Sequence, residues 1–447
     1  MEEVDMQADH LLIQTIDNLV QETYKPTEPG AAIIVVRDGK IIFRKGQGMA
    51  NLELGVPIEP DMVFRLGSIT KQFTVVAVLM LAEQGKLALD DSISNFLPDY
   101  PTHDYLITVK HLLTHTSGIK SYTSMPEWPP LWRKDFTVQE LIALFKYQPM
   151  QSAPGKQWAY NNSGYILLGA IIEKVSGLSY EQFIQQNIFE PLGMKQSYYD
   201  SPTRVIPRRV AGYDKSSDVY TNAAYLSMTQ PYAAGALAST VDDLVLWDSA
   251  LYTEQLLKHE TLQQAHISHR LTDGSSTAYG YGWAISEYAG HRLIEHGGGI
   301  HGFRTRAIRM PDDHVFVAVL SNNGGTDPEQ LAFKIAALVI GQPYTEPTPI
   351  EISSELLARC EGVYQNRATD EWKFVCEDNQ LFAQRGQDPR TELIPFSPNE
   401  FFFKDDSFYH LTFVGDPNGA ATTVELRGRD GIPEIAKRVD KSALDAS

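Results

Sequence analysis

Strand-like segments at the two ends of the first part of the chain restrict its fold more than any other feature. Two β-branched runs, AAIIVVRDG (31–39) and KIIFRKG (40–46), are joined by an Asp-Gly pair that is typical of a tight hairpin. Further strand-like runs return only late, as YGYGWAIS, HRLIEH, FRTRAIRM and HVFVAVLSN between residues 279 and 322. These segments share a core most simply if they form one antiparallel sheet built from both ends of this region.

Helical segments fill the sequence between and after these strands. Apolar residues at helical spacing predict helices over residues 11–20, 69–84, 138–146, 164–175, 180–187, 241–252 and 328–340. We expect the first and last helices to cover one face of the sheet and the middle helices to pack on the other. The predicted fold class is α/β of the α+β type, an antiparallel sheet flanked by helices with an added helical subdomain.

The composition changes after residue 341. The stretch GQPYTEPTPIEISSE (341–355) holds three prolines and reads as a linker. Beyond it, short apolar runs such as GVYQN, WKFVCEDNQLFAQ and TTVELRG alternate with turns, which predicts a small all-β barrel or sandwich. We therefore expect a first domain over 1–341, a linker over 342–354 and a β-domain over 355–447.

The chain has only two cysteines, Cys360 and Cys376, so a zinc ribbon or a cysteine-rich framework is excluded. Both lie in short β-like runs on either side of a polar turn. A hairpin centred near Ala368 would bring them opposite each other and allow a disulfide. The alternative is a pair of half-buried free thiols.

Charge and hydropathy exclude several classes of partner. A net charge of −18 disfavours nucleic acids and anionic membrane surfaces, and no apolar stretch reaches the length of a membrane span. The start, MEEVDMQADH, has no secretion-signal pattern, so the protein stays in the cytoplasm or the sequence is the mature part of an exported protein. No motif indicates a cofactor. The pairs His111/His115 and His266/His269 lack the adjacent glutamate of a His-Glu-x-x-His helix, and we expect no metal site.

The segment GSITKQF (67–73) places Ser68 three residues before Lys71, at the start of a long apolar run. If a helix begins at the serine, the lysine lies one turn further on the same face. A serine becomes nucleophilic when a base takes its proton, and a lysine kept neutral by burial is such a base. The alternative is a helix-capping serine with a solvated lysine. A second match, Ser117 and Lys120, lies in a loop that cannot hold the pair on one helical face.

Two further motifs carry polar groups suited to the same chemistry. In APGKQWAYNNSGY (153–165), Tyr160 and Asn162 follow a Pro-Gly turn and precede a helix, so a phenol and an amide project from one loop. In EHGGGIHGF (295–303), His296 precedes three glycines at the end of a strand. Glycines there let a substrate lie against the strand edge, and the Gly299 N–H is a candidate oxyanion donor. The alternative for the glycines is a flexible hairpin loop.

Together the three motifs resemble those of the serine hydrolases with the β-lactamase and penicillin-binding-protein fold. They are most similar to the branch with class C β-lactamases, D-alanyl-D-alanine carboxypeptidases, D-aminopeptidases and class VIII-type esterases. That branch carries Ser-x-x-Lys, Tyr-x-Asn and Lys/His-x-Gly, matched here by Ser68/Lys71, Tyr160/Asn162 and His296/Gly298. The stretches LLTHTSGI (112–119) and PLGM (191–194) are also typical of it. The resemblance covers residues 11 to 341, and the tail resembles an appended lipocalin-like domain.

The resemblance implies acyl transfer without a cofactor. In that mechanism Ser68 attacks a carbonyl, and Lys71 with Tyr160 carries the proton to the leaving group. The N–H groups of Ser68 and Gly299 bind the oxyanion, Asn162 orients the substrate, and water releases the acyl group. The implied substrates are small esters, amides or short peptides, and a homo-oligomer is compatible with the family.

The sequence departs from the β-lactamases of the branch where they have Lys-Thr-Gly and this chain has His296, Gly297 and Gly298. A lysine there would help to bind a substrate carboxylate, whereas a histidine is only partly charged near neutral pH. This favours an esterase or a D-amino-acid-type peptidase or amidase over a β-lactamase or a DD-carboxypeptidase. Arg304 and Arg306 are either an anion partner or ordinary strand charges. A catalytically silent binding or scaffold protein is the alternative of another class.

Overall fold

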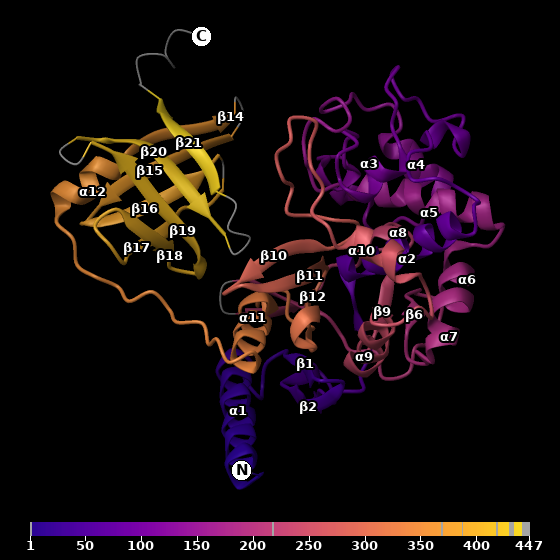
Figure 1. Ribbon diagram of the computed structural model, residues 1–447, viewed down its shortest axis with the longest axis horizontal. Coiled ribbons are helices and arrows are strands. Elements are labelled where there is room, and N and C mark those ends of the chain that lie inside the picture. Colours follow the sequence, from indigo (N-terminus) through magenta and orange to yellow (C-terminus); the bar gives the residue numbers. More distant parts are fainter. Residues whose placement is uncertain are drawn as a thin grey trace. The chain divides into compact units, whose positions relative to one another are not determined.

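The protein is described from a computed structural model, which covers residues 2–216, 219–367, 370–386, 388–416, 419–428 and 433–439. The chain divides into two compact units (Figure 1). The first consists of Met1–Ile285 and His291–Pro343, and the second of Ser286–Gly290 and Tyr344–Ser447. None of the helices in these described residues is long and apolar enough to cross a membrane.

A six-stranded antiparallel sheet forms the centre of the first unit and has the order β10-β11-β12-β13-β1-β2. Its strands are β1 (Ala31–Arg37), β2 (Lys40–Gln47), β10 (Ala284–Tyr288), β11 (His291–Ile300), β12 (Phe303–Met310) and β13 (Val315–Ser321). In β1, Ile34 lies opposite Ala318 of β13 on one side and Arg44 of β2 on the other. The early and late strands therefore meet in one sheet, as the sequence predicts.

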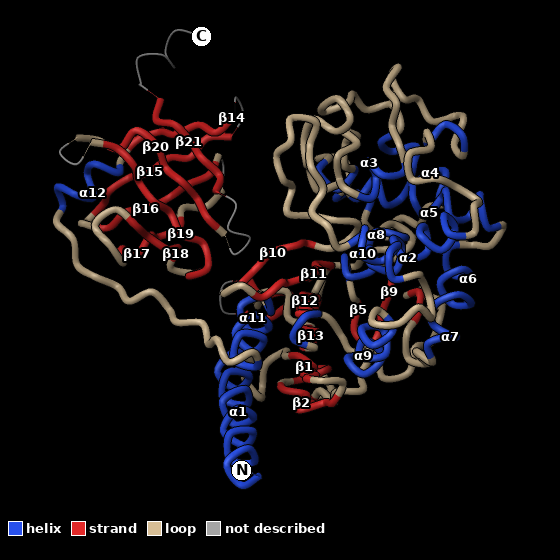
Figure 2. The backbone as a smooth tube through the Cα atoms, viewed as in Figure 1, coloured by secondary structure: helices blue, strands red, loops and turns tan. Residues whose placement is uncertain are grey.

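Helices cover both faces of this sheet (Figure 2). Helices α1 (Glu2–Thr23) and α11 (Pro328–Val339) pack together on one face. On the other face lie α9 (Val241–Ala250) and the helical part of the unit. The latter comprises α2 (Thr70–Glu83), α3 (Val109–Leu113), α4 (Val138–Phe145), α5 (Asn162–Ser176), α6 (Tyr180–Ile184), α7 (Glu190–Leu192), α8 (Tyr232–Gly235) and α10 (His259–Ala265). Because β1 is covered on both faces, its six apolar residues are all buried instead of alternating with polar ones.

Short strands complete the first unit. They are β3 (Met49–Asn51), β4 (Val56–Pro57), β5 (Phe64–Arg65), β6 (Tyr198–Tyr199), β7 (Tyr213–Ser216), β8 (Val219–Asn222) and β9 (Leu237–Ser239). The β1–β2 turn follows the prediction, because Asp38 and Gly39 both have positive φ angles, 52° and 72°. The strand expected over YGYGWAIS is wrong in its first half. It begins only at Ala284, since Gly282 has a φ of +74° and lies close against the backbone of α2.

The second unit is a closed eight-stranded barrel in which each strand pairs with the next, and the last pairs with the first. The strands are β14 (Gly362–Arg367), β15 (Asp370–Glu377), β16 (Gln380–Arg385), β17 (Thr391–Pro395), β18 (Glu400–Phe403), β19 (Asp406–Gly415), β20 (Ala421–Arg427) and β21 (Pro433–Val439). This is the up-and-down order of lipocalin barrels. The sequence left a barrel and a sandwich open, and the structure is a barrel. Aromatic side chains such as Phe374, Phe401 and Phe413 fill its core.

One helix of the second unit was not predicted. Helix α12 (Ser354–Cys360) begins after Ser353, whose side chain caps it by accepting a hydrogen bond from the Leu356 N–H. Cys360 therefore ends a helix instead of lying on a strand. Cys360 and Cys376 are both free thiols, and the predicted turn at Ala368 lies outside the described residues.

The close approach of α5 and α8 generates a first prediction. A Cβ added at Gly169 of α5 would lie 2.3 Å from Tyr232 and 2.6 Å from Ala233, whereas one added at Gly164 would have its nearest neighbour at 3.6 Å. We expect Gly169→Ala to lower the free energy of unfolding by about 1–3 kcal/mol through overpacking, despite the better helix propensity of alanine. Gly164→Ala on the same helix is the matched control and should show no loss. Urea unfolding measures both, and equal stability of the two variants would contradict the close packing.

Candidate active site

Ser68 and Lys71 lie side by side at the start of α2. Ser68 belongs to the short 3₁₀ turn η1 (Gly67–Ile69), so the α-helix starts at Thr70, one residue later than a capping serine at position 68 would imply. The distance from Lys71 Nζ to Ser68 Oγ is 3.0 Å. The lysine side chain is fully buried, while the serine is half-buried. The alternative of a solvated lysine is therefore excluded by the structure.

The other contacts of Lys71 determine what its amine can do. Its Nζ lies 2.9 Å from Asn162 Oδ1 and 2.9 Å from the Ala234 carbonyl oxygen, and both of these atoms only accept hydrogen bonds. Burial lowers the pKa of Lys71 well below its usual value, which favours the neutral amine. A neutral amine has two N–H groups and one lone pair. When the two acceptors take both N–H groups, the lone pair faces Ser68 Oγ.

Tyr160 also lies near Ser68. Desolvation raises the pKa of its phenol, which stays neutral, and the Ser68 side chain is near enough to offset part of that rise. Tyr160 as a whole residue is 38% exposed, and the centroid of its ring lies 4.7 Å from Lys71 Nζ. The ring of Tyr165 lies 5.3 Å from the same atom. Ser68 Oγ therefore has both an amine and a phenol nearby, and each of them can carry a proton.

His296 lies behind this group and is buried, with 6% of its surface exposed. Its Nδ1 contacts the backbone carbonyl oxygen of the next residue, Gly297, and its Nε2 lies 2.9 Å from the Tyr279 hydroxyl. A carbonyl oxygen only accepts, so Nδ1 carries the proton and Nε2 accepts from the tyrosine. Burial and the nearby Lys71 lower the pKa of His296 to about 3. The expectation of a partly charged histidine near neutral pH is therefore wrong, because this imidazole is neutral there.

A second buried histidine, His115, packs against Tyr160 with ring centroids 4.4 Å apart. Its Nδ1 accepts a hydrogen bond of 3.1 Å from the Asn161 N–H, so the proton is on Nε2. Burial lowers the pKa of His115 well below its usual value, and Lys71 adds to the effect. Both histidines near the lysine are thus neutral at neutral pH.

The glycines after His296 are part of a strand and do not form a loop. Strand β11 runs through them to Ile300, which faces Phe303 across a two-residue turn. The two residues of such a closing pair hydrogen-bond each other, and along an antiparallel ladder hydrogen-bonded pairs alternate with pairs that are not hydrogen-bonded. The next pair, Gly299 and Arg304, is therefore not hydrogen-bonded. The N–H of Gly299 therefore points away from β12, toward the edge next to η1. Gly67 has a φ of +54°, and a Cβ added there would lie 3.0 Å from Gly299 N.

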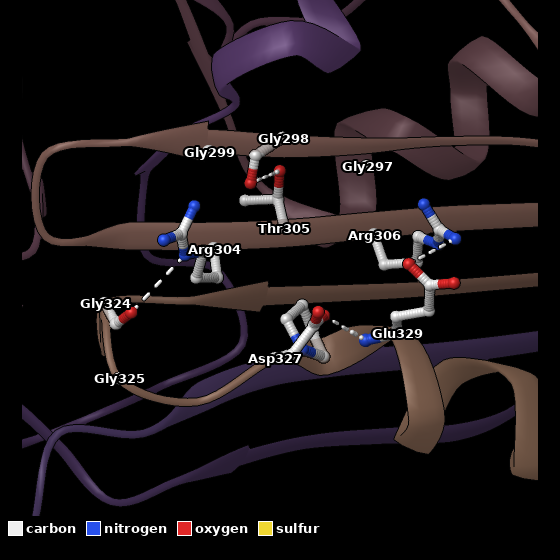
Figure 3. Close-up of a pocket in the computed structure, with 11 residues that line it drawn as sticks. Gly297, Gly298, Gly299, Arg304, Thr305, Arg306, Gly324, Gly325, Asp327 and Glu329 are labelled. Atoms are coloured by element: carbon white, nitrogen blue, oxygen red, sulfur yellow. Dashed lines mark hydrogen bonds and ion pairs between the residues drawn. The ribbon is translucent and has the colours of Figure 1, made fainter. Parts of the chain in front are cut away.

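Arg304 and Arg306 of β12 lie over the glycine segment on the face opposite to the one that Leu66 approaches (Figure 3). Arg306 pairs with Glu329 at 2.6 Å and with Glu295 at 3.4 Å, and Arg304 Nε donates to the Gly324 carbonyl at 3.3 Å. They line a separate pocket of about 430 Å³. They therefore engage neighbouring groups of the protein and do not line the pocket beside Ser68.

A small pocket of about 100 Å³ opens beside Ser68. Most of its lining is apolar or aromatic, and none of its described lining residues is Asp, Glu, Lys or Arg; they are Gly67, Ser68, Tyr122, Thr123, Trp128, Asn162, Leu226, Pro231, Ala234, Gly235, Gly299, Ile300 and His301. Gln230 holds the aromatic wall. It accepts from Trp128 Nε1 at 2.8 Å, and its backbone carbonyl accepts from the Tyr122 hydroxyl at 2.7 Å.

The structure thus brings five sequence-predicted residues around one point: Ser68, Lys71, Tyr160, Asn162 and Gly299. His296 and Gly298 lie behind this point and do not line the pocket. Asn162 is the first residue of α5 and contacts Lys71, a contact that the motif alone did not indicate. The Ala234 carbonyl and Thr123 were missed. A backbone carbonyl leaves no signal in a sequence, and Thr123 belongs to no motif.

Several known proteins are similar to this chain in sequence and fold. The Beta-lactamase family model matches residues 13–340. Penicillin-binding protein 4* of Bacillus subtilis (strain 168) is 30% identical over 405 residues, which cover 83% of this chain and 87% of that protein. A D-aminopeptidase of Gluconobacter oxydans (strain 621H) is 27% identical over 76% of this chain and 64% of its own length. The octameric penicillin-binding protein homologue from Pyrococcus abyssi has a TM-score of 0.67 at 27% identity, over 96% of this chain and 99% of its own.

The buried, neutral His296 generates a prediction about pH and stability. Its pKa is about 3 in the folded protein and ordinarily about 6.5, so between these values the unfolded chain binds a proton that the folded protein does not. His296 therefore makes stability fall as the pH drops from about 6.5 toward 3, by up to about 1.4 kcal/mol per pH unit. We expect His296→Gln, whose amide oxygen can accept from Tyr279, to flatten this slope.

Urea unfolding at several pH values between 3.5 and 7 measures the slope. Replacement of the exposed His103 by glutamine is the control for loss of an imidazole and should leave the slope as in the wild type. A His296→Gln variant with the wild-type slope would show that the imidazole binds protons equally in both states.

Proposed function

The chain belongs to the beta-lactamase family of serine hydrolases, and on that premise we propose that it cleaves ester or amide bonds through an acyl-enzyme formed on Ser68. The observation that carries the proposal is the position of Lys71 Nζ, 3.0 Å from Ser68 Oγ and 2.9 Å from each of two acceptors, Asn162 Oδ1 and the Ala234 carbonyl oxygen. If the amine is neutral and these two acceptors take its two N–H groups, its lone pair is left for the serine proton. A serine next to a buried neutral base is the arrangement that nucleophilic catalysis needs.

The proposed reaction runs in two halves. Ser68 Oγ attacks the carbonyl carbon while its proton moves to Lys71 Nζ. The lysine returns a proton through the Tyr160 hydroxyl to the leaving oxygen or nitrogen, and the bond to the leaving group breaks. Water then attacks the acyl-enzyme, gives its proton to the same pair, and Ser68 takes one back as the acid leaves. Lys71 and Tyr160 thus end as they began.

Backbone N–H groups stabilise the oxyanion in this proposal. The N–H of Ser68 lies at the start of η1, and that of Gly299 points to the same edge of β11. Each such donor contributes about 3–4 kcal/mol to transition-state stabilisation in well-studied cases. Gly298 allows the approach, because any side chain there would collide with the Leu66 carbonyl and with Thr305. The neutral His296 accepts a hydrogen bond from the Tyr279 hydroxyl and thereby helps to fix the position of β11.

The pocket beside Ser68 indicates which acyl groups fit. Its walls include Trp128, Leu226 and Ile300, and the described lining residues supply no carboxylate, ammonium or guanidinium group. A substrate ammonium moved into it would be desolvated without a carboxylate partner, and a substrate carboxylate would find no ammonium or guanidinium group among these residues. We therefore infer that the substrates are esters of small uncharged acyl groups. Amides are the second candidate, supported by the similarity to a D-aminopeptidase.

The direct test compares the wild type with Ser68→Ala. We expect the wild type to hydrolyse p-nitrophenyl acetate and butyrate and to be labelled by a fluorophosphonate, because both reactions need an activated serine. Ser68→Ala should lose both, with a fall in turnover of at least about 10³-fold. Spectrophotometric turnover and gel detection of the label are the measurements.

Two outcomes would contradict this assignment. Equal labelling of Ser68→Ala would place the reactive group elsewhere. A folded wild type that neither turns over esters or amides nor takes the label would support the alternative of a silent binding or scaffold protein.

A second experiment tests the inferred acyl group. We expect kcat/KM to be at least about tenfold higher for p-nitrophenyl butyrate than for the negatively charged p-nitrophenyl hemisuccinate or the positively charged p-nitrophenyl ester of D-alanine, because the described lining residues supply no carboxylate, ammonium or guanidinium group. Nitrocefin, which carries a carboxylate, should turn over slowly for the same reason.

The control is Trp128→Ala, which enlarges the pocket without adding charge. It should shift the preference toward longer neutral acyl chains and leave the order of neutral over charged substrates unchanged. Rapid hydrolysis of nitrocefin or of the hemisuccinate would contradict the inferred selectivity.

A further inference from the structure

The two ends of the Asn162 amide have different partners. Its Oδ1 accepts from Lys71 Nζ at 2.9 Å, and its Nδ2 donates to Thr123 Oγ1 at 3.0 Å. Asn162 is the first residue of α5, so its backbone is fixed by the helix, and only rotation of the amide would exchange the two ends. The partner at Nδ2 therefore influences which end faces the lysine.

Thr123 lies in a short segment that is docked onto the start of α5. The segment is the 3₁₀ turn η3 (Tyr122–Ser124) with the preceding Ser121. Ser121 Oγ accepts from the Asn162 N–H at 3.2 Å and lies 3.0 Å from Thr123 Oγ1. The Tyr122 N–H donates to Ser163 Oγ at 2.9 Å. These contacts hold the Thr123 hydroxyl in front of the amide.

We propose that Thr123 is a positioning residue: its hydroxyl accepts the hydrogen bond of Asn162 Nδ2, keeps Oδ1 turned toward Lys71, and thereby keeps the lone pair of the lysine directed at Ser68. The inference rests on the proposed function, in which this lone pair takes the serine proton.

A reversed amide would change the role of the lysine. With Nδ2 facing the neutral amine, an amide N–H would occupy the lone pair of Lys71. The two N–H groups of the amine would then go to the Ala234 carbonyl and to Ser68 Oγ. The amine would donate to the serine and could no longer take its proton, although every group in the site would remain hydrogen-bonded.

Apart from Lys71 and Thr123, no described residue hydrogen-bonds the side-chain amide of Asn162. The titratable groups that face Lys71 are Tyr160 and Tyr165, which present ring faces, and the buried histidines His115 and His296. Burial keeps both imidazoles neutral at neutral pH. The orientation of the Asn162 amide is therefore the variable that decides whether the lone pair is available.

Thr123→Val tests the proposal, because it removes the hydroxyl and keeps the shape of the side chain. We expect the maximal kcat/KM for p-nitrophenyl butyrate to fall by at least about tenfold. We also expect the acidic limb of the pH profile to move to lower pH, because an amide N–H facing Lys71 disfavours the ammonium form. Thr123→Ser keeps the hydroxyl and should restore both values.

The direction of the shift separates positioning from mere loosening. A loosened site would admit water to Lys71 and move its pKa up toward the ordinary value for lysine, so the limb would move to higher pH. The matched control is Thr229→Val. Thr229 is also a half-buried loop threonine, accepts from the Phe136 N–H at 3.0 Å and lies 2.8 Å from Ser227 Oγ, and its variant should leave the limb unchanged.

A readout without turnover makes the test independent of the proposed function. In the full-length protein labelled with [ε-¹³C]lysine, Lys71→Met identifies the Lys71 resonance, and its titration gives the pKa directly. We expect a lower pKa in Thr123→Val than in the wild type and in Thr123→Ser. If the wild type proves inactive on every ester and amide, the proposed function fails, while this titration still decides the role of Thr123.

An unchanged or higher Lys71 pKa in a folded Thr123→Val protein would overturn the proposal. Circular dichroism establishes folding. If the valine variant does not fold, Thr123→Ala removes the same hydroxyl without branching at Cβ and is judged by the same two readouts.

Discussion

A buried lysine amine without an ion-pair partner is the constraint that organises the first unit. None of the ion pairs between described residues involves Lys71, and its side chain is fully buried. Burial without an ion-pair partner disfavours the ammonium form and lowers the pKa of Lys71 well below its usual value, which favours the neutral amine in the folded protein. A neutral amine donates hydrogen bonds through two N–H groups and accepts one through its lone pair, so its chemistry depends on its orientation. Its surroundings therefore determine whether Lys71 donates to Ser68 or accepts from it.

Groups from separate parts of the chain bury Lys71 and fix the orientation of its amine. Helix α2 is buried on nearly every side, so Lys71 cannot reach solvent. The carbonyl of Ala234 comes from α8, which the Thr74 hydroxyl ties to α2 through the carbonyl of Ala233 at 2.7 Å. The amide of Asn162 comes from the first turn of α5. The sheet adds the edge of β11, where the glycines allow η1 to approach the strand closely. Loosening any one of these contacts would change the direction of the lone pair.

The sequence reveals the parts of this arrangement that depend on local chemistry. The Asp38-Gly39 turn, the long buried helix after Ser68 and the alternating strands of the tail follow from neighbouring residues, and the structure has each of them. The contacts that complete the site depend on tertiary approach. The Ala234 carbonyl has no side-chain signature, and the strand start at Ala284 depends on the packing of Gly282 against α2. Helix α12 is different, since its capping Ser353 was a local signal that the proline-rich linker obscured.

The substitution of histidine for the lysine of related β-lactamases is consistent with the same electrostatic constraint. His296 and Lys71 disfavour each other's protonation, so a site that holds both buried groups is least costly when neither is charged. With His115 also neutral, the polar centre around Ser68 carries no net charge at neutral pH. In such surroundings the negative charge that develops on an attacked carbonyl is the strongest charge present, and backbone N–H groups stabilise it more than they would in water. A neutral centre beside an apolar pocket therefore suits a reaction in which charge arises only in the transition state.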